Sequence, residues 1–464
     1  MSGLDATFLY TETGGMHMHV VGVMVFDPST STEPYSFDRI KELVASRLAG
    51  MPHFRQKLAM VPLRLHHPVW VDDEEFDLDF HIRRVACPSP GTLDELAGVA
   101  ADIASRRLDR DHPLWQMYVV EGLEDGLIGV VMKVHHSATD GVSGASLLAQ
   151  LFELEPDPAP RELAAVGEPA RRPSDLALIG YAVSEWARHP MRIAKVVPST
   201  LMGATNLIRT RRARTGRGGM ALPLTAPRTP FNGNITPHRT VAFVNVPLAD
   251  LKAIKNAFGT TLNDVVLTVS ASALRDYLAK HGELPESSLQ ASVPVSTHGE
   301  GGTKKGVNQI STMFVTLATD IEDPVERLLA IHEMTNGAKE DHKAVGAHLL
   351  QEWAEFAAPL TFGLAARLIA NPAVAERLTP SNLVISNVPG PSFPLYFAGA
   401  ELKAMYPLGP LTAGMGLNLT VMSLRDSVGF GFIACRELLP DVQDLAACVP
   451  AAVAELLDAA RTAA

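Results

Sequence analysis

Cysteine is scarce in this sequence. The three cysteines, Cys87, Cys435 and Cys448, stand far apart, and none has the spacing of a zinc or redox motif. We therefore expect no disulfide framework, and the thiols fit packing positions in a reducing cytoplasm.

Long hydrophobic runs are missing as well. No segment approaches the ~20 apolar residues that cross a bilayer. The first residues, 1–5, place no basic region before an apolar run, so a signal peptide is not expected, and neither end carries a lipidation motif. These absences predict a cytoplasmic protein whose membrane contact, if any, is peripheral.

Positive charge is in deficit overall. The chain has 40 lysines and arginines against 51 acidic residues, a net charge of -11 that argues against general nucleic-acid binding. Apolar residues make up 47% and charged residues 20%, a composition typical of globular proteins. At 464 residues the chain is too long for one ordinary core, so two domains are expected.

One segment departs from this acidic balance. Between residues 186 and 217 every charged side chain is basic: Arg188, Arg192, Lys195, Arg209, Arg211, Arg212, Arg214 and Arg217. Such a segment can lie on anionic lipid, or it can be a solvated linker between domains, and the sequence leaves both readings open.

Strand-like and helix-like segments alternate along the chain, which predicts an α/β fold. Strands are expected at 18–26, 116–123, 127–134, 238–246, 289–295, 313–318, 383–387, 415–423 and 428–435, with strand segments across 70–85. Helices are expected at 37–49, 93–107, 142–152, 248–257, 261–278, 324–336, 344–369 and 441–460. We predict an N-terminal domain at 1–185, a basic helical linker or crossover at 186–237 and a C-terminal domain at 238–464.

The most informative stretch is His135-His136-Ser137-Ala138-Thr139-Asp140-Gly141, which follows a buried strand pattern and precedes a helical one. A histidine at a strand end can act as a general base, because its ordinary pKa lies near neutrality. Asp140 and Gly141 suit a tight turn that fixes the loop. The alternative is a buried histidine pair followed by an ordinary helix N-cap at Asp140.

Neighbouring histidines on an extended chain point to opposite sides. This geometry, with no cysteine pair or carboxylate cluster nearby, argues against a metal site at His135 and His136. One ring is expected to face the reacting centre, and the other to be held in the structure. A second pair, His66-His67, lacks the glycine and the aspartate spacing, and we interpret it as a loop or edge strand without a catalytic role.

The HHxxxDG pattern is the signature of the CoA-dependent acyltransferase superfamily. Further stretches resemble the bacterial wax ester synthase/acyl-CoA:diacylglycerol acyltransferase family from one end of the chain to the other. They are Leu4–Leu9, Met16–His19, Pro113–Trp115, Thr261–Val265 and Ser386–Pro391. The resemblance implies two chloramphenicol-acetyltransferase-like domains, with mixed sheets flanked by helices and an active-site tunnel at their interface.

The resemblance also implies an activity. Acyl-CoA would donate a long acyl chain to the hydroxyl of diacylglycerol or of a long-chain alcohol, with no metal and no permanently bound cofactor. His136 would be the general base, His135 and Asp140 would hold the loop, and Gly141 would let the backbone approach the substrate. A lipid acceptor makes a peripheral position on the inner membrane or on lipid droplets plausible.

The supporting motifs each have two readings. Pro113, Leu114 and Trp115 can anchor the core or touch substrate. Asn263 and Asp264 can cap a helix or orient groups near the site, and Asn263 is a candidate oxyanion donor. The loop at 301–306 can meet CoA phosphates or be an ordinary exposed loop.

Two rival functions remain open from the sequence. One is a condensation-type acyltransferase that takes carrier-protein thioesters. The other is a catalytically silent protein of lipid surfaces.

Overall fold

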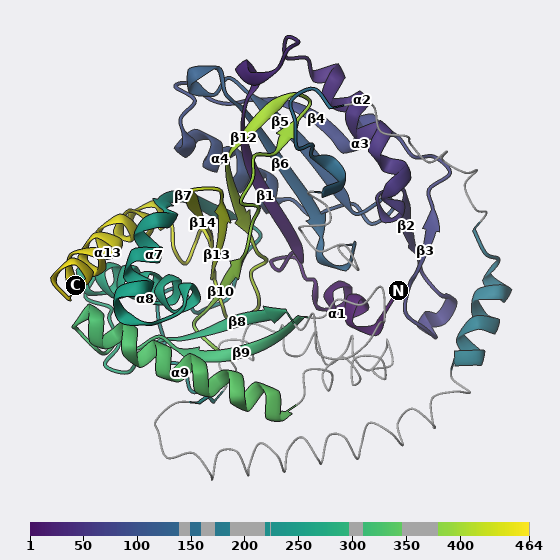
Figure 1. Cartoon of the computed structure of the whole chain (residues 1–464). Coiled ribbons are helices and arrows are strands. Elements are labelled where there is room, and N and C mark those ends of the chain that lie inside the picture. Colours follow the sequence, from purple (N-terminus) through teal and green to yellow (C-terminus); the bar gives the residue numbers. More distant parts are fainter. Residues whose placement is uncertain are drawn as a thin grey trace.

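The structure, a computed structural model, describes residues 1–138, 149–158, 172–185, 219–222, 224–296, 310–345 and 379–463. These residues form two six-stranded sheets, with a two-stranded sheet beside the first (Figure 1). Helices flank both large sheets, so the predicted α/β class with mixed sheets is confirmed.

The first sheet has the strand order β11-β12-β1-β6-β5-β4. Its strands are β1 (His19–Asp27), β4 (Ile82–Ala86), β5 (Trp115–Glu121), β6 (Ile128–His135), β11 (Tyr396–Phe397) and β12 (Ala400–Leu408). Neighbours run antiparallel, except for the parallel pair β4 and β5. The two-stranded sheet joins β2 (Gln56–Ala59) to β3 (Val69–Asp72).

Strand β6 ends at His135, the first residue of the histidine pair, and all eight of its residues are buried. Its side chains alternate between two hydrophobic clusters, because successive strand residues point to opposite faces. Val131 packs with α4 (Leu93–Ser105), whereas Val130 and Met132 pack with α2 (Phe37–Arg47). A strand covered on both faces is a rigid support for the turn that follows it.

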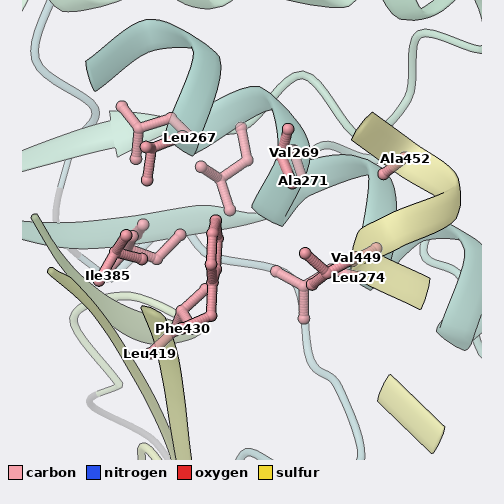
Figure 2. Close-up of a cluster of buried hydrophobic side chains, with 14 of the residues drawn as sticks. Leu267, Val269, Ala271, Leu274, Ile385, Leu419, Phe430, Val449 and Ala452 are labelled. Atoms are coloured by element: carbon pink, nitrogen blue, oxygen red, sulfur yellow. The ribbon is translucent and has the colours of Figure 1, made fainter. Parts of the chain in front are cut away.

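The second sheet has the order β7-β14-β13-β10-β8-β9. Its strands are β7 (Arg239–Pro247), β8 (Gln290–Ser296), β9 (Ile310–Thr316), β10 (Leu383–Val388), β13 (Leu417–Leu424) and β14 (Ser427–Cys435). Among the described residues of this half, the helices are α7 (Leu248–Phe258), α8 (Leu262–Lys280), α9 (Pro324–Val345) and α13 (Val442–Ala463). Figure 2 shows the core between them, where Leu274 of α8 and Val449 of α13 lie near Phe430 of β14.

Strand β12 joins the two halves of the molecule. It pairs with β1 from Val21 opposite Leu408 to Asp27 opposite Glu401, although it lies late in the chain. It also contacts β13 and β14 of the second sheet.

Glycines allow this close crossing of the two sheets. A Cβ on Gly429 would stand 2.5 Å from the carbonyl oxygen of Met405, and one on Gly431 would stand 2.3 Å from that of Pro407. The backbone of β12 therefore approaches β14 where a side chain would block it.

Most expected elements are present within a few residues of their predicted ends. The expectation for 70–85 is wrong in part, because the short helix α3 (Leu78–His81) separates β3 from β4. The helix expected at 324–336 continues to Val345, and β2, β11 and β12 were not predicted. The helices predicted at 142–152 and 344–369 fall mostly outside the described residues. The domain limits at 185 and 238 stay a prediction, and the first sheet takes β11 and β12 from beyond the second limit.

Candidate functional site

The histidine turn begins where β6 ends. His135 is the last residue of β6, and His136 opens the one-turn helix η6 (His136–Ala138). Two backbone bonds hold the turn: the His135 N–H donates to the Leu114 carbonyl at 2.9 Å, and the His136 N–H donates to the Met18 carbonyl at 2.8 Å. Leu114 precedes β5 and Met18 precedes β1, so the two strands that pair with β6 both fix the backbone of the histidine pair.

The His135 ring is buried inside the protein, with 1% of the residue exposed. Its Nδ1 accepts the Ser137 backbone N–H at 3.1 Å and lies 2.7 Å from the Ser137 hydroxyl. Since Nδ1 is an acceptor here, the neutral ring carries its proton on Nε2. Burial lowers the pKa of His135 well below its ordinary value, so the ring is uncharged.

The His136 ring has a different environment. It stacks on Phe8, with ring centroids 4.0 Å apart and planes inclined by 22°. Phe8 belongs to α1 (Gly3–Thr11), which contacts η6 directly. Burial lowers the pKa of His136 below its ordinary value, while the charge of Asp5 acts in the opposite direction. A lowered pKa keeps the imidazole neutral near pH 7, the state that can accept a proton.

Asp140 and Gly141, the other two residues of the motif, lie outside the described residues. Their expected parts in holding the loop and admitting the substrate stay predictions. The predicted CoA-phosphate loop at 301–306 and the basic run between 186 and 217 also fall outside the described residues.

The Pro113–Trp115 stretch is buried beside the histidine turn. Leu114 and Trp115 are 0% and 1% exposed. The Trp115 indole N–H donates to the Phe54 carbonyl at 2.8 Å, and its ring stacks on His81 with centroids 4.5 Å apart. Through the Leu114 carbonyl this stretch also holds the backbone of His135. Its geometry favours the role of core anchor.

Asp264 is buried and forms the capping box of helix α8 with the N-cap residue Thr261. Its carboxylate accepts the Thr261 backbone N–H at 2.9 Å and the Thr261 hydroxyl at 2.8 Å, and the Thr261 hydroxyl accepts the Asp264 N–H. His332 and Thr335 of α9 each lie 2.7 Å from the same carboxylate. These partners outweigh burial and hold the pKa of Asp264 below its usual range. Asp264 therefore serves as the capping group that the sequence allowed.

Asn263, the candidate oxyanion donor, is tied to a neighbouring motif. Its side-chain oxygen accepts the Asn387 amide at 3.4 Å. This contact joins the start of α8 to the end of β10. It uses the oxygen of the Asn263 side chain and not its NH₂ group. The hydrogen bond runs to Asn387 and not to the histidine turn, so the oxyanion role stays a prediction.

The second histidine pair lies in a loop before β3. His67 is buried and its Nδ1 lies 3.0 Å from the Tyr10 hydroxyl, while the His66 ring packs edge-on against Tyr181. These contacts account for the pair as packing residues. Over the described part of the chain, no group of three or more histidine, cysteine, aspartate and glutamate side chains is arranged to hold a metal ion.

Two residues that pack against the histidines, Phe8 and Glu12, were not predicted as site residues. Phe8 stands within the matched stretch 4–9, so the resemblance held a signal for it. Glu12 stands between the matched stretches 4–9 and 16–19, and it lies against His135 and His19. Its place is visible only once α1 is docked beside β6.

Comparisons with known proteins identify the family of this chain. The profile of the wax ester synthase/diacylglycerol acyltransferase catalytic domain matches residues 1–266, and that of the C-terminal domain matches residues 307–457. The chain belongs to the wax ester synthase/diacylglycerol acyltransferase family. The resemblance noted in the sequence is confirmed, and with it the acyltransferase class.

Relatives of this family align along nearly the whole chain. A putative diacylglycerol O-acyltransferase of Mycobacterium tuberculosis is 42% identical over 462 residues, which cover 99% of this chain and 90% of the relative. The solved wax ester synthase/diacylglycerol acyltransferase of Marinobacter aquaeolei VT8 is 32% identical, with a TM-score of 0.69 and 98% of each chain covered.

A more distant likeness concerns the fold alone. The starter condensation domain of rhizomide synthetase superposes with a TM-score of 0.55 at 11% identity and covers 99% of this chain. Together with the Marinobacter structure, this likeness confirms the expected fold class.

Proposed function

We propose that this protein transfers a long-chain acyl group from acyl-CoA to the hydroxyl of diacylglycerol, with long-chain alcohols as a second class of acceptor. The observation that carries the proposal is the neutral His136 in an HHxxxDG turn, in a chain that belongs to the wax ester synthase/diacylglycerol acyltransferase family. Triacylglycerol or wax ester is the product.

In the proposed reaction His136 removes the proton from the acceptor hydroxyl as the oxygen attacks the thioester carbonyl. The tetrahedral intermediate then collapses, the carbon–sulfur bond breaks, and the imidazolium returns its proton to the CoA thiolate. The ester and free CoA balance the alcohol and the acyl-CoA. A positioned general base of this kind contributes about 10²- to 10⁴-fold.

The proposed reaction also gives roles to Asp140, Gly141 and Asn263. Asp140 braces the loop and Gly141 admits the substrate to its backbone. Asn263 stabilises the oxyanion through its NH₂ group, because the bond from Asn387 uses only the oxygen of the Asn263 side chain. The substrates meet in a tunnel between the units 1–185 and 238–464, which 186–237 connects.

The test is CoA release from palmitoyl-CoA with dioleoylglycerol or hexadecanol, followed by extraction of the product. Wild-type protein and His66→Ala should release CoA only with an acceptor, and His136→Ala should lose that release. His66 is the matched control because it is a histidine of the second pair, and its ring packs against Tyr181. No release with either acceptor would overturn the proposal, and acyl carrier thioesters would then be tried as donors.

We also propose a peripheral position on an anionic lipid surface. No helix in the described residues is long and apolar enough to span a membrane. The helical residues 175–185 support peripheral docking, because Leu176 and Val183 are 82% and 60% exposed there. The basic run that follows in the sequence complements anionic headgroups. Leu176→Ser/Val183→Ser protein should sediment less with anionic vesicles, and unchanged sedimentation would contradict this position.

A further inference from the structure

A buried carboxylate that the proposed reaction does not use lies behind the histidine turn. Glu12 caps the C-terminus of α1, and its side chain is 1% exposed. The Glu12 Oε2 atom lies 3.2 Å from Arg107 Nη2 and accepts a hydrogen bond from Arg110. Arg110 also donates to the Leu9 carbonyl at 2.9 Å. A carboxylate in this position must be paired, because an isolated buried charge is costly.

Contacts with His19 and Arg110 keep Glu12 ionised. Burial alone would raise the pKa of this carboxyl group, but the contacts with His19 and Arg110 outweigh burial and hold its pKa well below the usual range. Arg107 and Arg110 are themselves partly exposed, so the negative charge is the buried member of the group. Glu12 therefore presents a fixed negative charge to its buried neighbours.

Those neighbours are two neutral histidine rings. Glu12 Oε1 lies 3.6 Å from His19 Nε2, and Glu12 Oε2 lies 4.0 Å from His135 Nε2. His19 and His135 are paired residues of β1 and β6, with ring centroids 5.9 Å apart. At 4.0 Å the attraction to His135 is electrostatic and not a direct hydrogen bond, and low-dielectric surroundings strengthen it.

The carboxylate faces the nitrogen of His135 that carries the proton. The Ser137 N–H donates to Nδ1, so the proton is on Nε2, towards Glu12. The other tautomer would set a second N–H against the Ser137 N–H and a lone pair against the carboxylate. Both of these contacts would be repulsive, and only the Ser137 hydroxyl, 2.7 Å from Nδ1, could accept that proton; Glu12 and the Ser137 N–H both favour the Nε2–H tautomer.

We propose that Glu12 is a positioning residue, which fixes the tautomer and orientation of His135 and thereby the backbone turn that presents His136. The chain of contacts runs from Arg107 and Arg110 through Glu12 to His135, and from His135 Nδ1 to the Ser137 N–H. Glu12 acts on the reaction only through this turn. The kinetic part of the test rests on the proposed acyltransferase function.

The experiment compares Glu12→Gln and Glu12→Ala with wild type and with the control Glu33→Gln. Glu33 is an exposed acid paired with Arg39 at 3.2 Å, remote from the histidines in its contacts. Ring ¹⁵N NMR on histidine-labelled protein reports the tautomer of His135, whose signals are assigned by their loss in His135→Gln. Thermal unfolding and kcat and KM with palmitoyl-CoA are measured on the same preparations.

The expected result is a shift of the His135 signals from the Nε2–H pattern in both Glu12 variants, larger in Glu12→Ala, with Glu33→Gln unchanged. The kcat should fall by about 10- to 100-fold while KM for palmitoyl-CoA stays within twofold. His135 signals unchanged in a folded Glu12→Gln would overturn the proposal, whether or not turnover is seen. A wild-type protein with the Nε2–H pattern but no turnover would instead count against the proposed function.

Discussion

Replacing Trp115 by phenylalanine separates the two roles that the sequence allowed for it. The change keeps an aromatic ring but removes the indole N–H, which donates to the Phe54 carbonyl at 2.8 Å inside the protein. A buried acceptor left without its donor costs about 1–3 kcal/mol, and the lost ring volume adds to this. We therefore expect Trp115→Phe to lower the free energy of unfolding by about 2–3 kcal/mol.

Urea unfolding followed by circular dichroism measures this loss, and Trp70→Phe is the matched control. Among the described residues Trp70 Nε1 has no hydrogen-bond partner, so its replacement removes no bond and should cost clearly less. The kcat and KM of folded Trp115→Phe should then stay near the wild-type values. A raised KM for the acceptor with unchanged stability would refute the core role and make Trp115 a substrate contact.

Two further predictions concern the crossing of the sheets and a buried cation. Gly431→Ala places a Cβ 2.3 Å from the Pro407 carbonyl oxygen and should lower the free energy of unfolding by about 1–3 kcal/mol. The control is Gly98→Ala in helix α4, where the new Cβ meets nothing within 4 Å; this change should raise the free energy of unfolding by about 0.5–1 kcal/mol. Equal effects in urea unfolding would contradict this. Burial lowers the pKa of Lys133 to about 7, so the unfolded chain holds this proton above pH 7 while the folded chain releases it. Stability from this residue should therefore rise by about 2 kcal/mol from pH 7 to pH 9, and a difference in unfolding free energy between wild type and Lys133→Met that does not change with pH would contradict the shift.

The sequence predicted the parts of the fold that depend on local patterning. Helix α8 is an example, because Thr261 and Asp264 form a capping box that can be read three residues apart. Strand β12 could not be found in this way. Its charged residues, Glu401 and Lys403, and Pro407 give a weak strand pattern, and its partner β1 lies almost four hundred residues earlier. Only the packed molecule shows that pairing.

At the site, too, some residues could be found from a local sequence pattern, whereas others are found only from the packing. His135 and His136 were found because the motif is contiguous and follows a buried strand. Leu114 was noted within a motif, but its bond to the His135 backbone depends on how β5 pairs with β6. No local sequence pattern marks Glu12, because its contact with His135 arises only when α1 lies beside the end of β6.

The pH dependence of kcat/KM tests the central claim, that His136 is the neutral general base. Burial lowers its pKa below the ordinary value of 6.5, so the base should be active above its own pKa and lose activity as the pH falls through it. With palmitoyl-CoA and dioleoylglycerol we expect an acidic limb with its midpoint below pH 6.5. His136→Ala should leave only residual turnover without this limb. A midpoint above pH 6.5, or the same limb in His136→Ala, would contradict the account.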